Sequence, residues 1–138
     1  MDVYLNLGSN IGDSINLIGR AVALIIERFH PASYRLSPPF HSQPWGFESE
    51  HEFVNIGMGL RLNRDMEPLD VLHRIKEIEQ SLSSTPHRNP DGTYRDRELD
   101  IDIIEIPGVE LDTPELTLPH PRAHQRDFVM IPLSQSRL

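Results

Sequence analysis

The stretch "EFVNIGMGLRL", residues 52–62, alternates apolar residues with small or polar ones. Successive side chains of a strand point to opposite faces of the sheet. One face of this strand would therefore carry Val54, Ile56, Met58, Leu60 and Leu62. The other face would carry Phe53, Asn55, Gly57 and Gly59. The pattern predicts a strand with one face in the core and the other free for a different use.

The same reasoning extends outward along the chain. Alternation predicts further strands at residues 2–8, 32–37 and 97–104. Apolar residues at helical spacing predict helices at residues 15–29 and 68–82. We expect loops at 38–51 and 83–96, and short pieces packed on the body after the last strand. The order β-α-β-β-α-β predicts an α+β fold: a ferredoxin-like antiparallel sheet with helices packed on it and a C-terminal extension.

The bulk properties narrow the class of protein. The 138 residues show no repeat or linker, so we expect one domain spanning 1–138. There is no cysteine, which excludes disulfides, and no apolar run approaches the roughly 20 residues of a membrane span. The first residues do not have the pattern of a signal peptide, so we expect a cytoplasmic protein. As a separate expectation, the protein is a monomer. A net charge of −8 argues against nucleic acid and anionic membranes as partners.

Two acidic residues lie side by side on the predicted strand 97–104. Asp100 and Asp102 share its polar face, and adjacent carboxylates repel each other unless water or a cation separates them. One interpretation is a water-facing strand with scattered acids. The other is a pair that binds Mg²⁺, which prefers one or two carboxylates plus phosphate oxygens.

The polar face of strand 52–62 suggests a binding surface. Gly57 and Gly59 would leave a bare floor on which a flat ligand could rest. Phe53 offers a ring for stacking, and Asn55 offers an amide that both donates and accepts. The alternative is a solvated face with one exposed aromatic residue.

Charged residues elsewhere leave two interpretations open. Glu79 falls within the apolar stripe of the helix 68–82, so it either reaches water at the edge of the stripe or serves a site. Arginines crowd both ends of the acidic strand, as a polyphosphate site requires, although each could also pair within a surface loop. These arginines are Arg88, Arg95, Arg97, Arg122 and Arg126.

Five motifs occur in order along nearly the whole chain: "LGSNIGD", "FHSQPWG", "EFVN", "RELDIDII" and "LPHPRAHQRDFVMIPL". Each is weak alone, but together they resemble the 6-hydroxymethyl-7,8-dihydropterin pyrophosphokinase family of folate biosynthesis. Members of that family transfer the terminal diphosphate of ATP to the hydroxymethyl group of the pterin and release AMP. The resemblance implies ATP and this pterin as substrates, and two Mg²⁺ ions.

The resemblance also implies roles for the matched residues. Asp100 and Asp102 match the pair that holds the two Mg²⁺ ions, with Arg97 and Arg88 as further catalytic groups. For the pterin it implies contacts from Ser42, Pro44, Trp45, Phe53, Asn55, Tyr94 and Phe128. For ATP it implies contacts from Glu79, Arg97, Thr117, His120 and Arg126.

The chain departs from the family pattern in three places. Ser83 and Ser84 stand where the family usually has Gly-Arg, and Arg88 is the candidate to replace that arginine. Tyr94 stands where the aromatic residue that closes over the site is often tryptophan. The sequence ends at "IPLSQSRL", where family members usually continue for about a strand and a turn.

Other classes of protein remain open at this point. A ligand-binding module of the same fold would explain the polar face without catalysis, and it would bind its ligand equally well without Mg²⁺. A palm-type nucleotidyltransferase would also pair acids on such a sheet, but it would release pyrophosphate rather than AMP. A catalytically inactive relative is the third alternative, if nothing replaces the missing Gly-Arg.

Overall fold

The computed structural model describes residues 1–10, 13–43, 52–82 and 99–138. Their helices and strands follow one another in this order: β1 (Asp2–Ser9), α1 (Ser14–Phe29), β2 (Ser33–Leu36), β3 (Phe40–Ser42), β4 (Phe53–Arg61), α2 (Pro68–Leu82), β5 (Asp100–Glu105), β6 (Leu111–Asp112), β7 (Thr117–Leu118), the 3₁₀ turn η1 (Ala123–Gln125) and α3 (Asp127–Gln135).

Within the described residues, five strands form one sheet. The main path runs β2-β4-β1-β5, β3 also pairs with β4, and every pairing is antiparallel. The prediction of an α+β protein with an antiparallel sheet is therefore confirmed. The helix predicted at 68–82 has the same bounds in the structure, and the strand predicted at 52–62 runs from 53 to 61.

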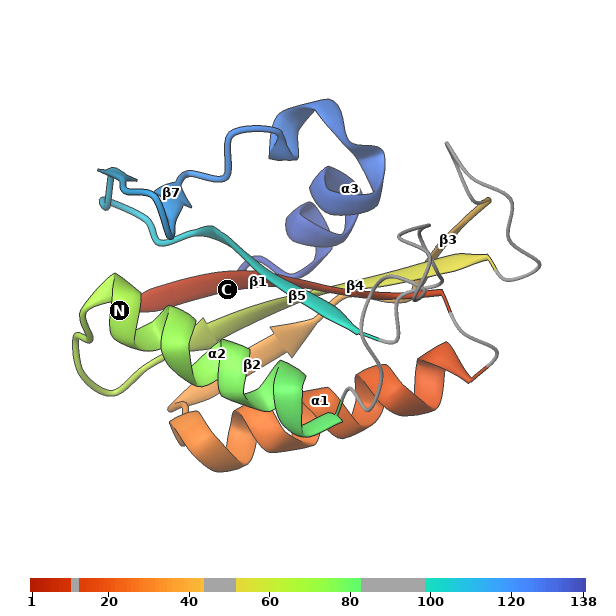
Figure 1. Cartoon of the computed structure of the whole chain (residues 1–138), viewed down its shortest axis with the longest axis horizontal. Coiled ribbons are helices and arrows are strands. Elements are labelled where there is room, and N and C mark those ends of the chain that lie inside the picture. Colours follow the sequence, from red (N-terminus) through yellow and green to blue (C-terminus); the bar gives the residue numbers. More distant parts are fainter. Residues whose placement is uncertain (11–12, 44–51, 83–98) are drawn as a thin grey trace, which may run out of the picture.

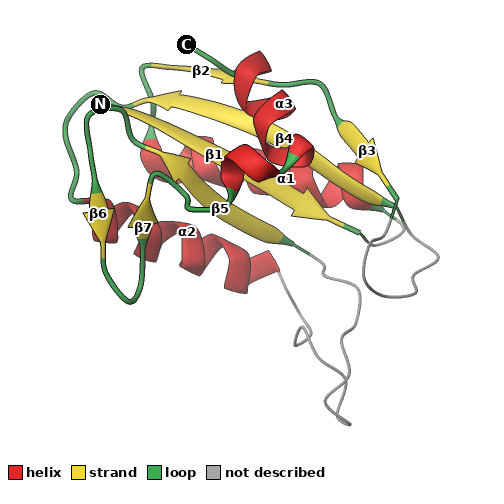
Figure 2. Ribbon diagram, turned by 90° about the horizontal axis from the view of Figure 1, so that it is seen from above, coloured by secondary structure: helices red, strands yellow, loops and turns green. Residues whose placement is uncertain are grey.

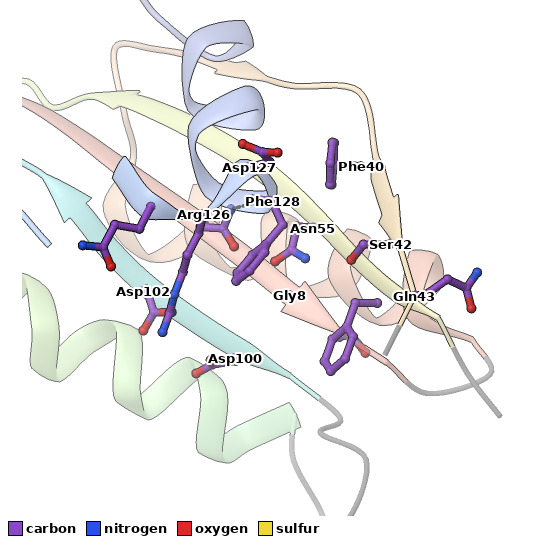
Figure 3. A pocket seen from close by; sticks show the side chains of 14 residues that line it. Gly8, Phe40, Ser42, Gln43, Asn55, Asp100, Asp102, Arg126, Asp127 and Phe128 are labelled. Atoms are coloured by element: carbon purple, nitrogen blue, oxygen red, sulfur yellow. Dashed lines mark hydrogen bonds between the residues drawn. The ribbon is translucent and has the colours of Figure 1, made fainter. Parts of the chain in front are cut away.

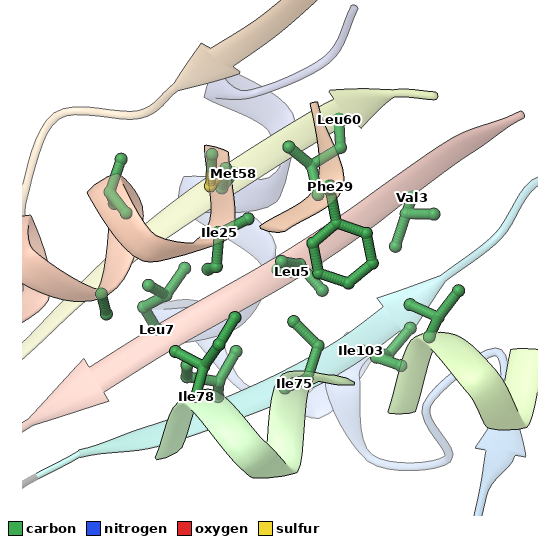
Figure 4. Close-up of a cluster of buried hydrophobic side chains, with 14 of the residues drawn as sticks. Val3, Leu5, Leu7, Ile25, Phe29, Met58, Leu60, Ile75, Ile78 and Ile103 are labelled. Carbon is green, nitrogen blue, oxygen red and sulfur yellow. The ribbon is translucent and has the colours of Figure 1, made fainter. Parts of the chain in front are cut away.

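One face of the sheet carries the core. Figure 1 shows α1 and α2 side by side under this face, and both helices bury their apolar stripes against it. Apolar side chains of β1, β4 and β5 meet those of the two helices (Figure 4). The residues at the centre of this core include Leu5, Leu7, Ile25, Met58, Leu60, Ile75, Ile78 and Ile103. The alternation that predicted these strands thus reflects a half-buried sheet.

The opposite face is partly covered by α3, which crosses β4 and β1 (Figures 1 and 2). A Cβ atom at Gly57 would lie 2.4 Å from the carbonyl oxygen of Pro132, and one at Gly59 would lie 2.5 Å from that of Ser136. The expectation that these two glycines form a bare ligand floor is therefore wrong. They lack side chains because the backbone of α3 and of the residue after it occupies that space.

Other expectations were wrong in detail. The segment 38–51 was expected to be a loop, yet its described part contains β3, which pairs Phe40 with Asn55 of β4. The last strand of the sheet was expected from 97 to 104. In the structure it runs from Asp100 to Glu105, and 97–98 lie outside the described residues. The proline-rich remainder forms a β6-β7 hairpin and α3, a nine-residue helix that contains Pro132.

In the described part of the chain, none of the helices combines the length and the apolar character needed to cross a membrane.

The close approach of α3 gives a first prediction. Gly57→Ala places a methyl group against the Pro132 backbone, so we expect it to reduce the free energy of unfolding by about 1–3 kcal/mol. Gly19→Ala is the control, because Gly19 lies exposed in α1 and a Cβ atom there would meet no other atom within 4 Å. We expect this control to stabilise the protein by about 0.5–1 kcal/mol. Urea unfolding of both variants tests this; equal effects would contradict the proposed packing of α3.

Candidate active site

The polar face of the sheet is arranged in rows by the strand register. In one row, Asn55 of β4 lies opposite Gly8 of β1, and Gly8 lies opposite Asp100 of β5. In the next row, Gly57 lies opposite Asn6, and Asn6 lies opposite Asp102. Side chains of one row point to the same face, so three strands contribute to one surface.

A pocket of about 820 Å³ opens between these rows and the N-terminal end of α3 (Figure 3). Its volume falls within the usual range for small-molecule sites, roughly 300–1,000 Å³. The described residues that line it are Asn6, Gly8, Ser9, Phe40, Ser42, Gln43, Phe53, Asn55, Asp100, Asp102, Gln125, Arg126, Asp127 and Phe128.

Gly8 supplies bare backbone at the floor of this pocket. A Cβ atom there would lie 2.6 Å from the Asn55 Oδ1 atom, so only glycine leaves room for the amide in its observed position. The Asn55 side chain is buried, 6% exposed, and faces the pocket. The absence of a side chain at Gly8 therefore makes room for the Asn55 amide beside the pocket.

Aromatic side chains from different elements border the pocket. Phe53 belongs to β4 and Phe128 to α3, and both line it. Figure 3 shows Phe128 and Asn55 on the lining of the same pocket and the Arg126 side chain extended toward Asp102. The Arg126 guanidinium carbon lies 5.6 Å from the centre of the Phe128 ring, within cation–π range.

Negative charge predominates in the described lining. Three carboxylates, those of Asp100, Asp102 and Asp127, accompany one guanidinium group, that of Arg126. Asp100 and Asp102 are half-buried, and both face the same side of β5. Two neighbouring carboxylates beside open space for phosphate oxygens match the ligands that Mg²⁺ prefers. The donor set therefore fits a magnesium site.

His120 lies close to these charges, although it does not line the pocket. Its backbone N–H donates to the carbonyl oxygen of Ile104, at 2.8 Å, which attaches the segment before η1 to β5. Burial lowers the pKa of its imidazole, and the positive charges of Arg126 and Arg122 lower it further, while Asp100 acts in the opposite direction. The neutral imidazole is thus favoured in the folded protein.

Glu79 is engaged at the other side of β5. Its Oε2 atom accepts a hydrogen bond from the backbone N–H of Ile101, at 2.6 Å, and its Oε1 atom lies 3.2 Å from Lys76 Nζ. β5 is the last strand on the main path of the sheet, so this N–H points away from β1. The carboxylate that stood out in the apolar stripe of α2 therefore holds β5 by its backbone, between Asp100 and Asp102.

The structure brings together many of the site residues named from the sequence. Seven of them line the pocket: Ser42, Phe53, Asn55, Asp100, Asp102, Arg126 and Phe128. Three described ones lie outside the lining: Glu79, Thr117, whose hydroxyl is 3.4 Å from Asp112 Oδ1, and His120. Five lie outside the described residues: Pro44, Trp45, Arg88, Tyr94 and Arg97.

The pocket also contains residues that the sequence reasoning did not select. Seven lining residues were not named as site residues: Asn6, Gly8, Ser9, Phe40, Gln43, Gln125 and Asp127. Phe40 and Gln43 flank the motif residue Ser42, and Gln125 and Asp127 flank Arg126. Proximity in sequence to a matched residue could have indicated these four. Gly8 and Ser9 belong to the motif "LGSNIGD", and Asn6 lies on the polar face of the strand predicted at 2–8.

The fold and the pocket define a class: a small α+β protein with a candidate ligand site on the sheet face opposite its two long helices, lined by paired acids, an amide and aromatic rings. Comparisons with known proteins narrow this class. The sequence profile of the 7,8-dihydro-6-hydroxymethylpterin-pyrophosphokinase (HPPK) family matches residues 4–137.

Three relatives are each named 2-amino-4-hydroxy-6-hydroxymethyldihydropteridine pyrophosphokinase. That of Porphyromonas gingivalis is 44% identical over 135 residues, covering 96% of this chain and 88% of the relative. That of Aquifex aeolicus is 34% identical, covering 95% of this chain and 77% of the relative. That of Bacillus subtilis is 30% identical, covering 96% of this chain and 75% of the relative. The chain belongs to the HPPK family, and it is therefore an enzyme of the pyrophosphokinase class.

The environment of His120 predicts a pH effect on stability. Its pKa is lower in the folded than in the unfolded protein, so the unfolded state binds the proton more tightly. Stability should therefore be full above the unfolded pKa of about 6.5 and decline as the pH falls toward the folded value. His120→Asn should flatten this decline in melting curves recorded from pH 8 to 5. His124→Asn controls for the loss of a neighbouring histidine, and an unchanged slope in His120→Asn would contradict the assignment.

The hydrogen bond from Ile101 to Glu79 predicts protection of one amide. Glu79→Gln keeps an oxygen acceptor, whereas Glu79→Leu removes it, so the Leu variant alone should raise amide hydrogen exchange at Ile101, by about tenfold. Glu77→Leu is the control, because Glu77 is exposed on the same helix and lies 3.9 Å from Arg28. Equal exchange at Ile101 in all variants would show that the bond does not protect this strand edge.

Proposed function

We propose that the protein transfers the diphosphate of ATP to the hydroxymethyl group of 6-hydroxymethyl-7,8-dihydropterin, in folate biosynthesis, and releases AMP. One observation supports this most directly: a single pocket contains both a pair of aspartates suited to Mg²⁺ and a buried amide beside aromatic rings. Membership of the HPPK family supplies the reaction class.

The pterin would bind in the part of the pocket lined by Phe53, Asn55 and Phe128, with its polar edge on Asn55. An Asn side chain can donate and accept at once, which suits the amide-like edge of a pterin ring. Phe53 and Phe128 come from different elements and would contact the two faces of the ring. Ser42 of β3 lies beside them, and by resemblance Pro44, Trp45 and Tyr94 complete this subsite.

The triphosphate would lie toward β5. Asp100 and Asp102 would hold two Mg²⁺ ions. When bound, these ions would neutralise phosphate oxygens and fix the orientation of the triphosphate. Arg126 extends toward this region and would hold phosphate charge. By resemblance Arg97 and Arg88 do the same, while Glu79, Thr117 and His120 belong to the nucleotide side.

Catalysis on this proposal consists of positioning. The pterin hydroxyl oxygen attacks the β-phosphorus of ATP and releases its proton to water. The bond from that phosphorus to the bridging oxygen breaks, and this oxygen leaves with AMP. The residues of the chain hold the hydroxyl and the triphosphate in line, so a bimolecular reaction proceeds as an intramolecular one. Arg126 stabilises the charge that develops on the phosphoryl oxygens.

We also infer the finer features that accompany this function. The strand order β2-β4-β1-β5 with two crossover helices supports a ferredoxin-like βαββαβ core. We propose that residues 1–138 act as one domain, as a cytoplasmic monomer that needs neither nucleic acid nor membrane. The net charge of −8 supports the last point.

The test of the function is product analysis. The protein is incubated with MgATP, with and without 6-hydroxymethyl-7,8-dihydropterin, and the nucleotides are separated by chromatography. We expect AMP in the presence of the pterin, with neither ADP nor free pyrophosphate as the main product. Release of pyrophosphate would instead indicate a nucleotidyltransferase, and binding without turnover would indicate an inactive relative.

The aspartate pair gives a separate prediction. Asp102→Ala should lower kcat by at least about a hundredfold, because a direct metal ligand contributes more than the outer contacts whose loss costs 10–100-fold. It should leave the melting temperature nearly unchanged, since it removes one of two like charges on a polar face. Asp65→Ala is the control for loss of an exposed aspartate, because the Asp65 side chain is 94% exposed and lies outside the pocket lining. A large loss of stability with little loss of activity would assign Asp102 a structural role.

A further inference from the structure

Asn6 is a buried polar residue that the proposed reaction does not use. It lies on β1, is 5% exposed, and lines the pocket beside Asp102. Its side-chain Nδ2 donates to the backbone carbonyl oxygen of Phe128, at 3.0 Å, across 122 residues of sequence. Because a carbonyl oxygen only accepts, the amide group must face Phe128 with its NH₂ end.

The acceptor of this hydrogen bond, the Phe128 carbonyl oxygen, has no regular donor within its own helix. In an α-helix the oxygen of residue 128 accepts from the N–H of residue 132. Residue 132 is Pro132, inside α3, and proline has no N–H. The Phe128 carbonyl therefore lacks its regular helical donor, and the Asn6 amide provides one from the sheet.

The same residues set the position of α3 over the pocket. The carbonyl oxygen of Pro132 packs against Gly57, and Gly57 lies opposite Asn6 on the neighbouring strand. The hydrogen bond to Phe128 and the packing at Gly57 thus attach the first turns of α3 at adjacent points of one row. Phe128, which borders the pocket, is held by its own backbone at one of those points.

We propose that Asn6 is a positioning residue for Phe128: its side-chain amide replaces the helical hydrogen bond that Pro132 cannot make, and so fixes the aromatic wall of the pterin subsite. This inference rests on the proposed function for the identity of the ligand. The hydrogen bond and the missing proline donor are independent of that identity.

A double-mutant cycle tests the proposal. Asn6→Leu keeps the approximate shape of the side chain and removes the donor, so the dissociation constant of 6-hydroxymethyl-7,8-dihydropterin should rise about tenfold. The KM for ATP should change less than about twofold. Pro132→Ala restores an N–H that can donate to Phe128, so in this background Asn6→Leu should change pterin affinity by less than about twofold.

The chain offers a matched control. Asn63 Nδ2 also donates to a backbone carbonyl, that of His30 at the end of α1, at 3.0 Å, but it is exposed and lies outside the pocket lining. Asn63→Leu removes the same kind of bond and should leave pterin affinity unchanged. Should Asn6→Leu fold poorly, Asn6→Ala takes its place in both backgrounds.

The outcomes separate this inference from the proposed function. An equal loss of pterin affinity in both backgrounds, or no loss in either, overturns the role of Asn6. If the unmodified protein does not bind the pterin at all, the proposed function fails, and urea unfolding of the same four proteins decides the structural part. If the effects of Asn6→Leu and Pro132→Ala on the free energy of unfolding are not additive, the Asn6 amide does replace the missing helical hydrogen bond. If the two effects are additive, this part of the proposal is overturned.

Discussion

The contact of two glycines of β4 with the backbone of α3 and of the residue after it is the constraint on which the site depends. The Pro132 carbonyl occupies the space that a side chain at Gly57 would fill, so the helix lies directly on the sheet. A second small apolar cluster, in which Val129 and Leu133 of α3 meet Tyr4 and Ile104, holds it there. This position places Arg126 and Phe128 over the uncovered part of the polar face. A larger residue at position 57 would move both side chains together with the helix.

The helices and strands on the apolar side could be predicted from the sequence because the spacing of their apolar residues follows from burial of one face. Helix α2 has a continuous 3.6-residue stripe and a proline suited to its first turn, and its predicted bounds were correct. The alternation in β4 and β5 correctly placed Asn55, Asp100 and Asp102 on one face, because a strand has only two faces. For these residues the prediction of the site followed directly from the prediction of the sheet.

The other side of the sheet could not be predicted in the same way. A glycine on a polar face indicates close approach, but not whether a ligand or a helix approaches, and at Gly57 and Gly59 it is a helix. In α3 itself Pro132 argues against a helix, and the compensating donor, Asn6, lies more than a hundred residues away. β3 has three residues and follows two prolines, too short for alternation to be visible. Phe128 was identified by resemblance alone, whereas Arg126 was already indicated as one of the arginines near the acidic strand.

The polar face of the sheet therefore both lines the pocket and supports α3. The boundary between these two uses lies between neighbouring rows of residues. The row of Asn55, Gly8 and Asp100 is open to the pocket, whereas the adjacent row begins at Gly57 under α3 and ends at Asp102 in the pocket. Asn6 lies at the centre of this second row and contacts the helix while lining the pocket. Changes in the first row can alter binding without displacing α3, which packs on the second row. Changes at the boundary must alter both, because the atoms that hold the helix also shape the cavity.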